Sequence, residues 1–327
     1  MPFITQELPT LARFRRVSPS MSIVLLGLCA DVIIALLKFS AARESGGSAL
    51  FAEGVHSVLD ALTEVILLYG LAAARRPANR DFQFGYGRAA FFWNLVAAML
   101  ILAVGAGFAF REGWHQYVSP QPLGPTSTSF LVLLLSFLID SGFAVITCRK
   151  VVRASSDHNL FRYLKRSRDG ATMTVLFTSF ASLAGIVVAA LGMVMSVRFG
   201  FPAADGVASL AIASMMAATA LLLANESRSL IIGASASPEI EQSVLRATAE
   251  VPEVRAANGL FSVRIGPEHL LVSISVAFRA DLTTEEIERA VIAVEGRVKH
   301  HVPQVSLVLI KPQSESRFRE VQAKRGW

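Results

Sequence analysis

Four ionisable residues lie close together in the stretch AEGVHSVLDALTE, residues 52–64, within an otherwise apolar segment. They are Glu53, His56, Asp60 and Glu64. In a helix, His56, Asp60 and Glu64 follow one another at four-residue intervals and therefore project from one face. A histidine nitrogen and a carboxylate at this spacing can bind one divalent cation, and zinc and related first-row metals prefer this combination. Because one helix supplies only part of a tetrahedral site, a second helix must complete it.

Other ionisable residues also lie inside or at the ends of apolar runs, where they are costly unless they face a bundle interior or a water-filled path. Asp31 and Asp140 lie deep in their runs. For each of them the sequence allows two roles, a hydrogen bond to another helix or a place on an ion path. Hydrogen bonding to neighbouring helices is also the alternative for the His56 and Asp60 pair. Glu53 lies near the end of its run, where exposure at the membrane interface and a functional role are both open. Asp205 follows FPAA and begins an apolar run, which predicts that it caps that helix.

The chain has 327 residues, of which 53% are hydrophobic and 17% charged, a composition typical of membrane proteins. Apolar runs long enough to cross about 30 Å of hydrocarbon as helices predict an all-α bundle of six transmembrane helices over residues 21–230, after a leader at 1–20. Lysine and arginine gather before the first run and in the second-to-third and fourth-to-fifth connections. The positive-inside rule therefore places both termini in the cytoplasm and explains the net charge of +6 without nucleic acid. The six runs are at about 21–42, 50–73, 90–112, 128–148, 171–197 and 204–224.

Residues 235–312 have a different pattern, without runs of spanning length. SPEIEQSVLRATAEV predicts a helix with Ser237 as N-cap and Pro238 at the first helical position. Two strands meeting at GPEH, a second helix capped at Thr283 or Thr284 and the closing strand VSLVLIKP follow. This order predicts a small α+β domain, and we expect the charged tail at 313–327 to be loose.

These features together resemble the cation diffusion facilitator family of divalent metal ion/proton antiporters. The resemblance covers about residues 20–312. The residues that carry it, besides the HxxxD of His56 and Asp60, are LLKFSAARESGGSALFAEGVHSVLDAL, DFQFGYGRAAFFW and ESRSLIIGASA.

The resemblance implies a transporter rather than an enzyme, without a cofactor, that exports a divalent metal, zinc first and manganese, iron or cobalt as alternatives, in exchange for protons. It implies a homodimer in the inner membrane of a bacterium, a ferredoxin-like cytoplasmic domain and a tetrahedral metal site between the second and fifth helices. His56 and Asp60 match the second-helix half of that site. An empty site of this kind can hold protons and release them when metal binds, and rocking of helices about a fixed site couples the two fluxes.

The fifth predicted span departs from the family pattern. It reads ATMTVLFTSFASLAGIVVAALG, with Val175, Thr178 and Ser179 where the family places ligands, and its sequence has no carboxylate, histidine or cysteine between residues 171 and 196. A hydroxyl is a weak ligand for zinc, so the usual two-plus-two site is incomplete.

Three explanations for the incomplete site follow from the sequence. Asp140, Asp31 or Glu64 could supply oxygen ligands to a displaced site. A harder ion such as manganese or magnesium could bind through carboxylates, hydroxyls and water. Alternatively, transport has been lost and the chain serves as a dimer partner or regulator. In the cytoplasmic domain, His269, His300 and His301 have no accompanying CxxC, which favours surface histidines over a regulatory metal site.

Overall fold

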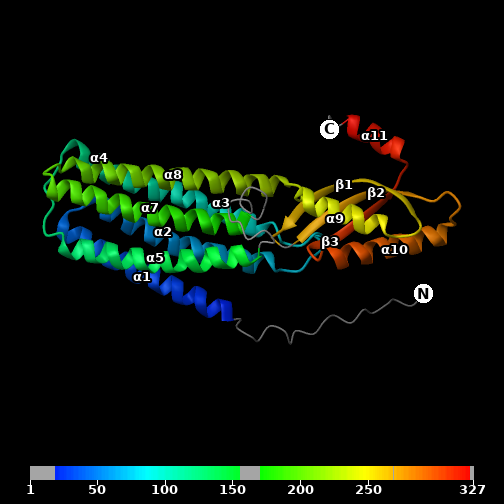
Figure 1. Cartoon of the computed structure of the whole chain (residues 1–327), viewed down its shortest axis with the longest axis horizontal. Coiled ribbons are helices and arrows are strands. Elements are labelled where there is room, and N and C mark those ends of the chain that lie inside the picture. The colour runs from blue at the N-terminus through cyan, green and yellow to red at the C-terminus, as the bar shows by residue number, and fades with distance from the viewer. Residues whose placement is uncertain (1–18, 155–169, 268, 325–327) are drawn as a thin grey trace.

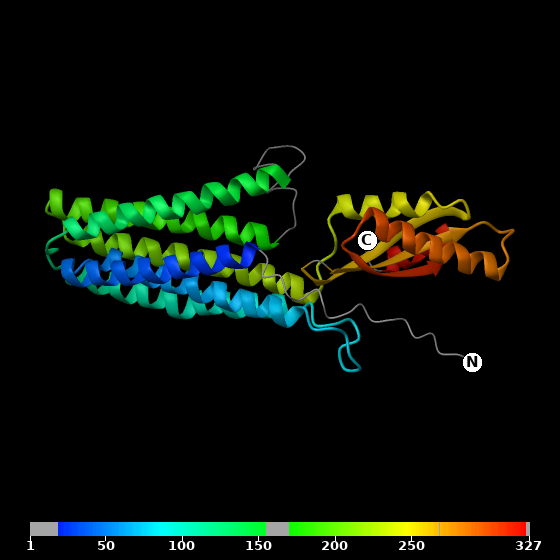
Figure 2. The ribbon, with the colours of Figure 1, turned by 90° about the horizontal axis from the view of Figure 1, so that it is seen from below.

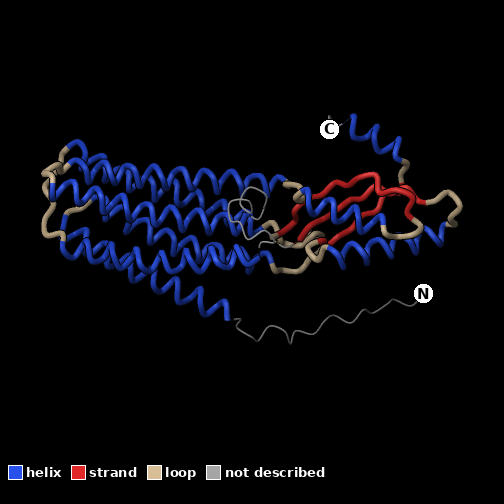
Figure 3. The backbone as a smooth tube through the Cα atoms, viewed as in Figure 1, coloured by secondary structure: helices blue, strands red, loops and turns tan. Residues whose placement is uncertain are grey.

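The computed structural model describes residues 19–154, 170–267 and 269–324 and has two parts, a bundle of long helices and a small α+β domain at one end of it (Figure 1, Figure 3). Within the described residues, five helical segments are long and apolar enough to cross a membrane. A sixth long helix, α1, packs against α2 and α5. The long helices are α1 (Pro19–Ser45), α2 (Ser48–Ala74), α3 to α4 (Ala89–Val118), α5 (Ser127–Ala154), α7 (Gly170–Arg198) and α8 (Ala203–Ile232).

The third of these helices is continuous but contains one π-helical segment. It consists of α3 (Ala89–Leu100), the π-helix η2 (Ile101–Ala106) and α4 (Gly107–Val118). Gly105 lies in the π-helical turn, and a side chain there would overlap Leu59 of α2 and come within 2.5 Å of Met216 of α8. The small residue therefore lets three helices approach closely beside the HxxxD segment.

Helix α2 is the central element of the bundle and contacts α1, α3, α4, α7 and α8. Its first turn is capped by a residue distant in sequence. Asp205, which is fully buried, accepts hydrogen bonds at Oδ2 from the Ser48 backbone N–H (2.6 Å), the Ser48 hydroxyl (2.8 Å) and the Ala49 N–H (3.4 Å). The prediction that Asp205 caps its own helix is wrong, since Pro202 is the N-cap of α8 and Asp205 lies in its first turn. The carboxylate instead accepts from the first-turn N–H groups of α2, which have no acceptor within their own helix. The helix dipole favours negative charge at this end.

The small domain has the predicted order of helix, two strands, helix and strand. In its three-stranded sheet, β1 pairs antiparallel with β2, and β2 pairs parallel with β3. Alternate residues of β2, such as Val272 and Ile274, are buried against the two helices together with Val244 and Val298. Thr283 and Glu286 form the capping box of the second helix, as predicted. The elements are α9 (Pro238–Ala249), β1 (Val254–Gly266), β2 (His269–Phe278), α10 (Thr284–His301) and β3 (Val305–Pro312).

The described part of the tail, up to Lys324, is not loose, contrary to the prediction. Residues Glu315–Lys324 form helix α11, and Phe318 on it is only 3% exposed. Its ring packs near Phe261 and against Gly259, where a side chain would collide with it. One aromatic anchor in an otherwise charged segment is a weak sequence signal, and the cavity that receives it exists only in the folded sheet.

The loop between α2 and α3 lies at the junction of the bundle and the small domain (Figure 2). Its Gly87 approaches the tip of the β1–β2 hairpin so closely that a side chain there would overlap the Ile265 carbonyl oxygen. On the other side of the hairpin, the Arg264 N–H donates to the carbonyl oxygen of Ala234, just after α8. The hairpin tip is therefore held between two segments of chain that leave the bundle.

Candidate metal site

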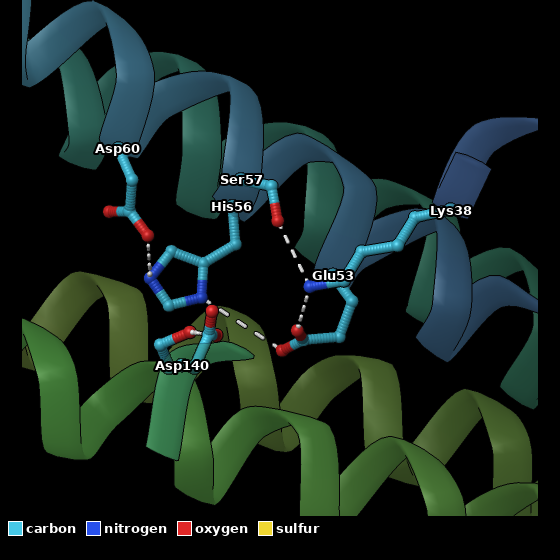
Figure 4. A network of polar contacts seen from close by, with 7 residues as sticks. Lys38, Glu53, His56, Ser57, Asp60 and Asp140 are labelled. Carbon is cyan, nitrogen blue, oxygen red and sulfur yellow. Dashed lines mark hydrogen bonds and ion pairs between the residues drawn. The ribbon is translucent and has the colours of Figure 1, made fainter. Parts of the chain in front are cut away.

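His56 and Asp60 lie on one face of α2, one turn apart, with His56 Nε2 3.6 Å from Asp60 Oδ2. His56 is 8% exposed, because α2 is surrounded by other helices. The HxxxD spacing thus brings an imidazole nitrogen and a carboxylate oxygen together inside the bundle. Figure 4 shows the His56 ring between Asp60 on one side and Glu53 on the other.

Glu53 is fully buried, which excludes the alternative of exposure at the membrane interface. Its Oε2 forms an ion pair with Lys38 Nζ of α1 at 2.8 Å, and the same ammonium donates to the Ser57 hydroxyl at 2.9 Å. The Lys38 side chain is itself only 1% exposed. A buried ion pair therefore links α1 to α2 at the level of His56 (Figure 4).

Lys38 is not among the site residues predicted from the sequence. A signal was present in the sequence. Lys38 and Glu53 lie eight residues before and seven after Gly46, which has a positive φ of 70° in the turn between the two helices. Antiparallel helices joined by a tight turn bring residues at equal distances from it side by side.

The second oxygen of Glu53, Oε1, faces His56. It lies 3.9 Å from His56 Nδ1, and neither atom has a hydrogen-bond partner. Helix α7 closes this side of the pair at Gly185, where a side chain would overlap Glu53 Oε1. Glycine at this position thus allows the α7 backbone to lie against the buried carboxylate.

Asp140 of α5 reaches the neighbourhood of the same ring, toward which its side chain points in Figure 4. Its Oδ2 accepts a hydrogen bond from the hydroxyl of Ser182 on α7 at 2.6 Å. The Asp140 and Asp60 carboxylates are near enough to repel each other. Of the two alternatives for Asp140, interhelical hydrogen bonding is therefore observed, and it directs the carboxylate toward the site.

The fifth span, α7, presents hydroxyls where the family pattern has ligands. Thr178 and Ser179 are partly buried on α7, and Ser182 follows them by one turn on the same face. Val175 belongs to the same helix, but its side chain lies outside the described residues. Sequence reasoning overlooked Ser182, although its spacing of three and four residues from Ser179 and Thr178 was a sufficient signal.

Glu64 and Asp31 lie farther along α2 and α1. Asp31 interacts electrostatically with Glu64 most strongly and then with Asp60 and Asp140. Glu64 Oε2 is buried and has no hydrogen-bond partner. Within the described ranges, however, no three histidine, cysteine or acidic side chains are grouped closely enough to hold one metal ion. The structure brings His56 and Asp60 together and leaves Asp140, Glu64 and Asp31 near them.

Comparison with known proteins shows what this arrangement is similar to. A family model described as the cation efflux transmembrane domain matches residues 24–232, from within α1 to the end of α8. The matched segment includes every acidic and histidine side chain of the site.

Individual relatives are distant in sequence. The chain is 23% identical over 264 residues to a mitochondrial proton-coupled zinc antiporter, SLC30A9, of Xenopus laevis, which covers 80% of this chain and 47% of the relative. It is 28% identical over 293 residues to a probable cation efflux system protein of Mycobacterium tuberculosis, covering 88% and 80%. The magnetosome protein MamB of Paramagnetospirillum magneticum is 20% identical over 276 residues, covering 84% and 87%. The chain spans about half the length of the zinc antiporter.

Proposed function

Because the chain belongs to the cation efflux family, the cation diffusion facilitators, we propose that it exports a divalent metal cation, zinc first, in exchange for protons. The chain is an integral membrane protein of a family that transports metal cations. The choice of zinc and of proton exchange is supported by the relative that is a proton-coupled zinc antiporter and by the donor atoms of the site.

The pair of His56 and Asp60 carries the proposal. Two ligands of a tetrahedral zinc ion, each about 2.0–2.2 Å from the metal, are separated by roughly 3.3–3.6 Å. His56 Nε2 and Asp60 Oδ2 are 3.6 Å apart, so one ion can contact both with little movement of either side chain. Both residues lie on α2, which contacts α1, the continuous α3–α4 helix, α7 and α8. The His56 side chain is 10% exposed and that of Asp60 is 29% exposed.

Asp140 is the third ligand in this proposal. Its hydrogen bond from Ser182 joins α5 to α7, and its side chain points toward the His56 ring (Figure 4). A shift of α5 toward α2 would bring it to the ion. Such a site has one nitrogen and two carboxylates, which suits zinc and also manganese, iron or cobalt.

Glu64 and Asp31 extend from this site toward the end of the bundle that carries the small domain. Their carboxyl groups lie near Asp60, whereas the Lys38 ammonium binds Glu53. A cation entering from that end would therefore meet carboxyl oxygens before it reaches His56. With positive residues in the loops at the same end, we place the small domain and both termini in the cytoplasm of a bacterium, and the chain in its inner membrane as a homodimer.

Transport into liposomes by the purified protein tests the proposal. We expect zinc-dependent proton movement with the wild-type chain and its loss with Asp60→Ala, because Asp60 is one of the two ligands in the proposed pair of His56 and Asp60. The matched control is Asp81→Ala, in an exposed loop, which should transport normally.

Unchanged flux in Asp60→Ala would refute the site assignment. A wild-type protein that moves no divalent cation would instead support the alternative, a dimer partner or regulator with an incomplete site.

A further inference from the structure

We propose that Glu53, held by Lys38, is a positioning residue that fixes the tautomer of His56. In this arrangement His56 Nδ1–H donates to Glu53 Oε1, and Nε2 presents its lone pair beside Asp60, where the cation binds. The inference rests on the proposed function for the identity of its ligand. It assigns a role to Lys38 of α1 and Glu53 of α2, neither of which contacts the cation.

The burial of the ion pair is the first argument. The side chains of Lys38 and Glu53 are 1% and 0% exposed. Removing both charges from water costs free energy that their mutual attraction only partly offsets, and well-packed apolar residues usually join two helices equally well. Joining α1 to α2 is therefore not a sufficient reason for a charged pair at this level.

The second argument concerns the hydrogen-bonding capacity of Glu53. Lys38 uses Oε2, whereas Oε1 is buried and has no hydrogen-bond partner. A carboxylate oxygen can only accept, so it needs a donor. His56 Nδ1 is 3.9 Å away and is also buried without a partner. A small rotation of the ring shortens this distance to that of a hydrogen bond and satisfies both atoms.

The third argument is the tautomer itself. A neutral imidazole carries one N–H and one lone pair. If Nδ1 carried the lone pair, it would face the Glu53 carboxylate, which is fully buried and has no other donor for Oε1. A lone pair on Nε2 also faces a carboxylate, but the Asp60 side chain is 29% exposed, so water can donate to it until the cation binds. With the proton on Nδ1, the lone pair lies on Nε2, which faces Asp60 Oδ2 at 3.6 Å. Metal-binding histidines generally donate their other ring N–H to a carboxylate or carbonyl in this way.

Neighbouring residues keep Glu53 in position. The Lys38 ammonium also donates to the Ser57 hydroxyl, which fixes the ammonium against α2. On the opposite side, the α7 backbone at Gly185 leaves no space for a side chain beside Oε1. The carboxylate is therefore held between α1 and α7, with one oxygen directed at His56.

A matched pair of double variants separates the effect of the hydrogen-bond acceptor at position 53 from the effect of its charge. Lys38→Met/Glu53→Gln and Lys38→Met/Glu53→Leu both remove the buried ion pair and fill the same space with similar volumes. Only the glutamine keeps an oxygen that can accept from Nδ1–H. Glu44→Gln, exposed near the end of α1, controls for the loss of a glutamate in the same helical hairpin.

The first measurement is the ¹⁵N spectrum of histidine-labelled, metal-free protein in lipid nanodiscs, at a pH high enough for the imidazole to be neutral. The His56 signals are those absent from His56→Gln. We expect a protonated Nδ1 in the wild type and in the glutamine double variant, and a shift toward protonated Nε2 in the leucine double variant. A structural role of Glu53 alone would not move these signals.

The second measurement is zinc transport by the same proteins in liposomes. We expect the half-saturating zinc concentration of the leucine double variant to exceed that of the glutamine double variant by about tenfold to a hundredfold. Glu44→Gln should match the wild type.

Two spectroscopic results would overturn the inference: protonated Nε2 on His56 in the wild type, or identical tautomers in the two double variants. Equal half-saturating concentrations in the two double variants would also overturn it. If the wild type moves no cation, the proposed function fails, while the ring nitrogen signals still decide whether Glu53 orients His56.

Discussion

Asp140 of α5 is hydrogen-bonded to α7, the helix on which this chain departs from the family pattern. The sequence of α7 offers hydroxyls instead of carboxylates, and one of them, Ser182, binds a carboxylate that belongs to α5. A carboxylate has a second oxygen, which can bind a cation while Oδ2 keeps its hydrogen bond. In the proposed site, α5 and α7 would thus supply together what the fifth helix alone supplies in the family pattern.

We predict different effects for substitutions of the two partners. Asp140→Asn should raise the half-saturating zinc concentration at least about tenfold, because an amide is a poor zinc ligand. Ser182→Ala should raise it less, since it removes only the group that orients the carboxylate. Zinc transport in liposomes measures both, with Ser214→Ala as a control, because the Ser214 hydroxyl is exposed and bonds only within α8. If Asp140→Asn transports with normal affinity, Asp140 is not a ligand.

At the scale of elements, the position of α2 is set by contacts with distant segments. Asp205 of α8 caps its first turn. Lys38 of α1 binds its buried glutamate. Gly185 of α7 lets that helix lie against the same glutamate. Each contact fixes the rotation or the axial position of α2, and with it the direction in which His56 and Asp60 point.

Replacing glycine with alanine tests the contact between α2 and α7. In Gly185→Ala the added methyl group overlaps Glu53 Oε1, so we expect a loss of stability of about 1–3 kcal/mol. Gly142→Ala on α5, where nothing lies within 4 Å of the added methyl group, should be neutral or stabilising by up to about 1 kcal/mol. Thermal unfolding of both proteins in detergent provides the comparison. Equal melting temperatures would show that α7 can move away from Glu53 without cost.

At the scale of the whole molecule, the bundle and the small domain meet where the loop after α2 contacts the tip of the β1–β2 hairpin. Gly87 and Gly266 approach each other with almost no space between their backbones. The loop that carries Gly87 connects α2 directly to α3, so a movement of α2 during transport would be transmitted to the hairpin. The small domain is thereby mechanically connected to the helix that carries His56 and Asp60.

Gly87→Ala should separate the loop from the hairpin, because the methyl group would overlap the Ile265 carbonyl oxygen. We expect faster amide hydrogen exchange at the hairpin tip, corresponding to a local loss of about 1–3 kcal/mol. Gly296→Ala on α10, where nothing lies within 4 Å of the added methyl group, is the control and should exchange like the wild type. Unchanged exchange in Gly87→Ala would mean that the contact does not hold the two parts together.

The sequence by itself determined the features that depend on local periodicity. The length of the apolar runs predicted the spanning helices, and the four-residue spacing placed His56 and Asp60 on one face. The sequence also predicted a helix start at Thr283 or Thr284, and Thr283 is the cap. Each of these follows from backbone geometry within one element.

Only the tertiary structure decided which elements share polar groups. In the structure Lys38 pairs with Glu53, and Asp205 caps α2 instead of its own helix. Asp140 accepts a hydrogen bond from Ser182, and Phe318 of the tail helix is buried. These contacts depend on the rotation and axial position of one helix against another. Because the helices are apolar both where they face lipid and where they face one another, many such rotations and positions are compatible with the same sequence pattern. Helical periodicity therefore does not select among them.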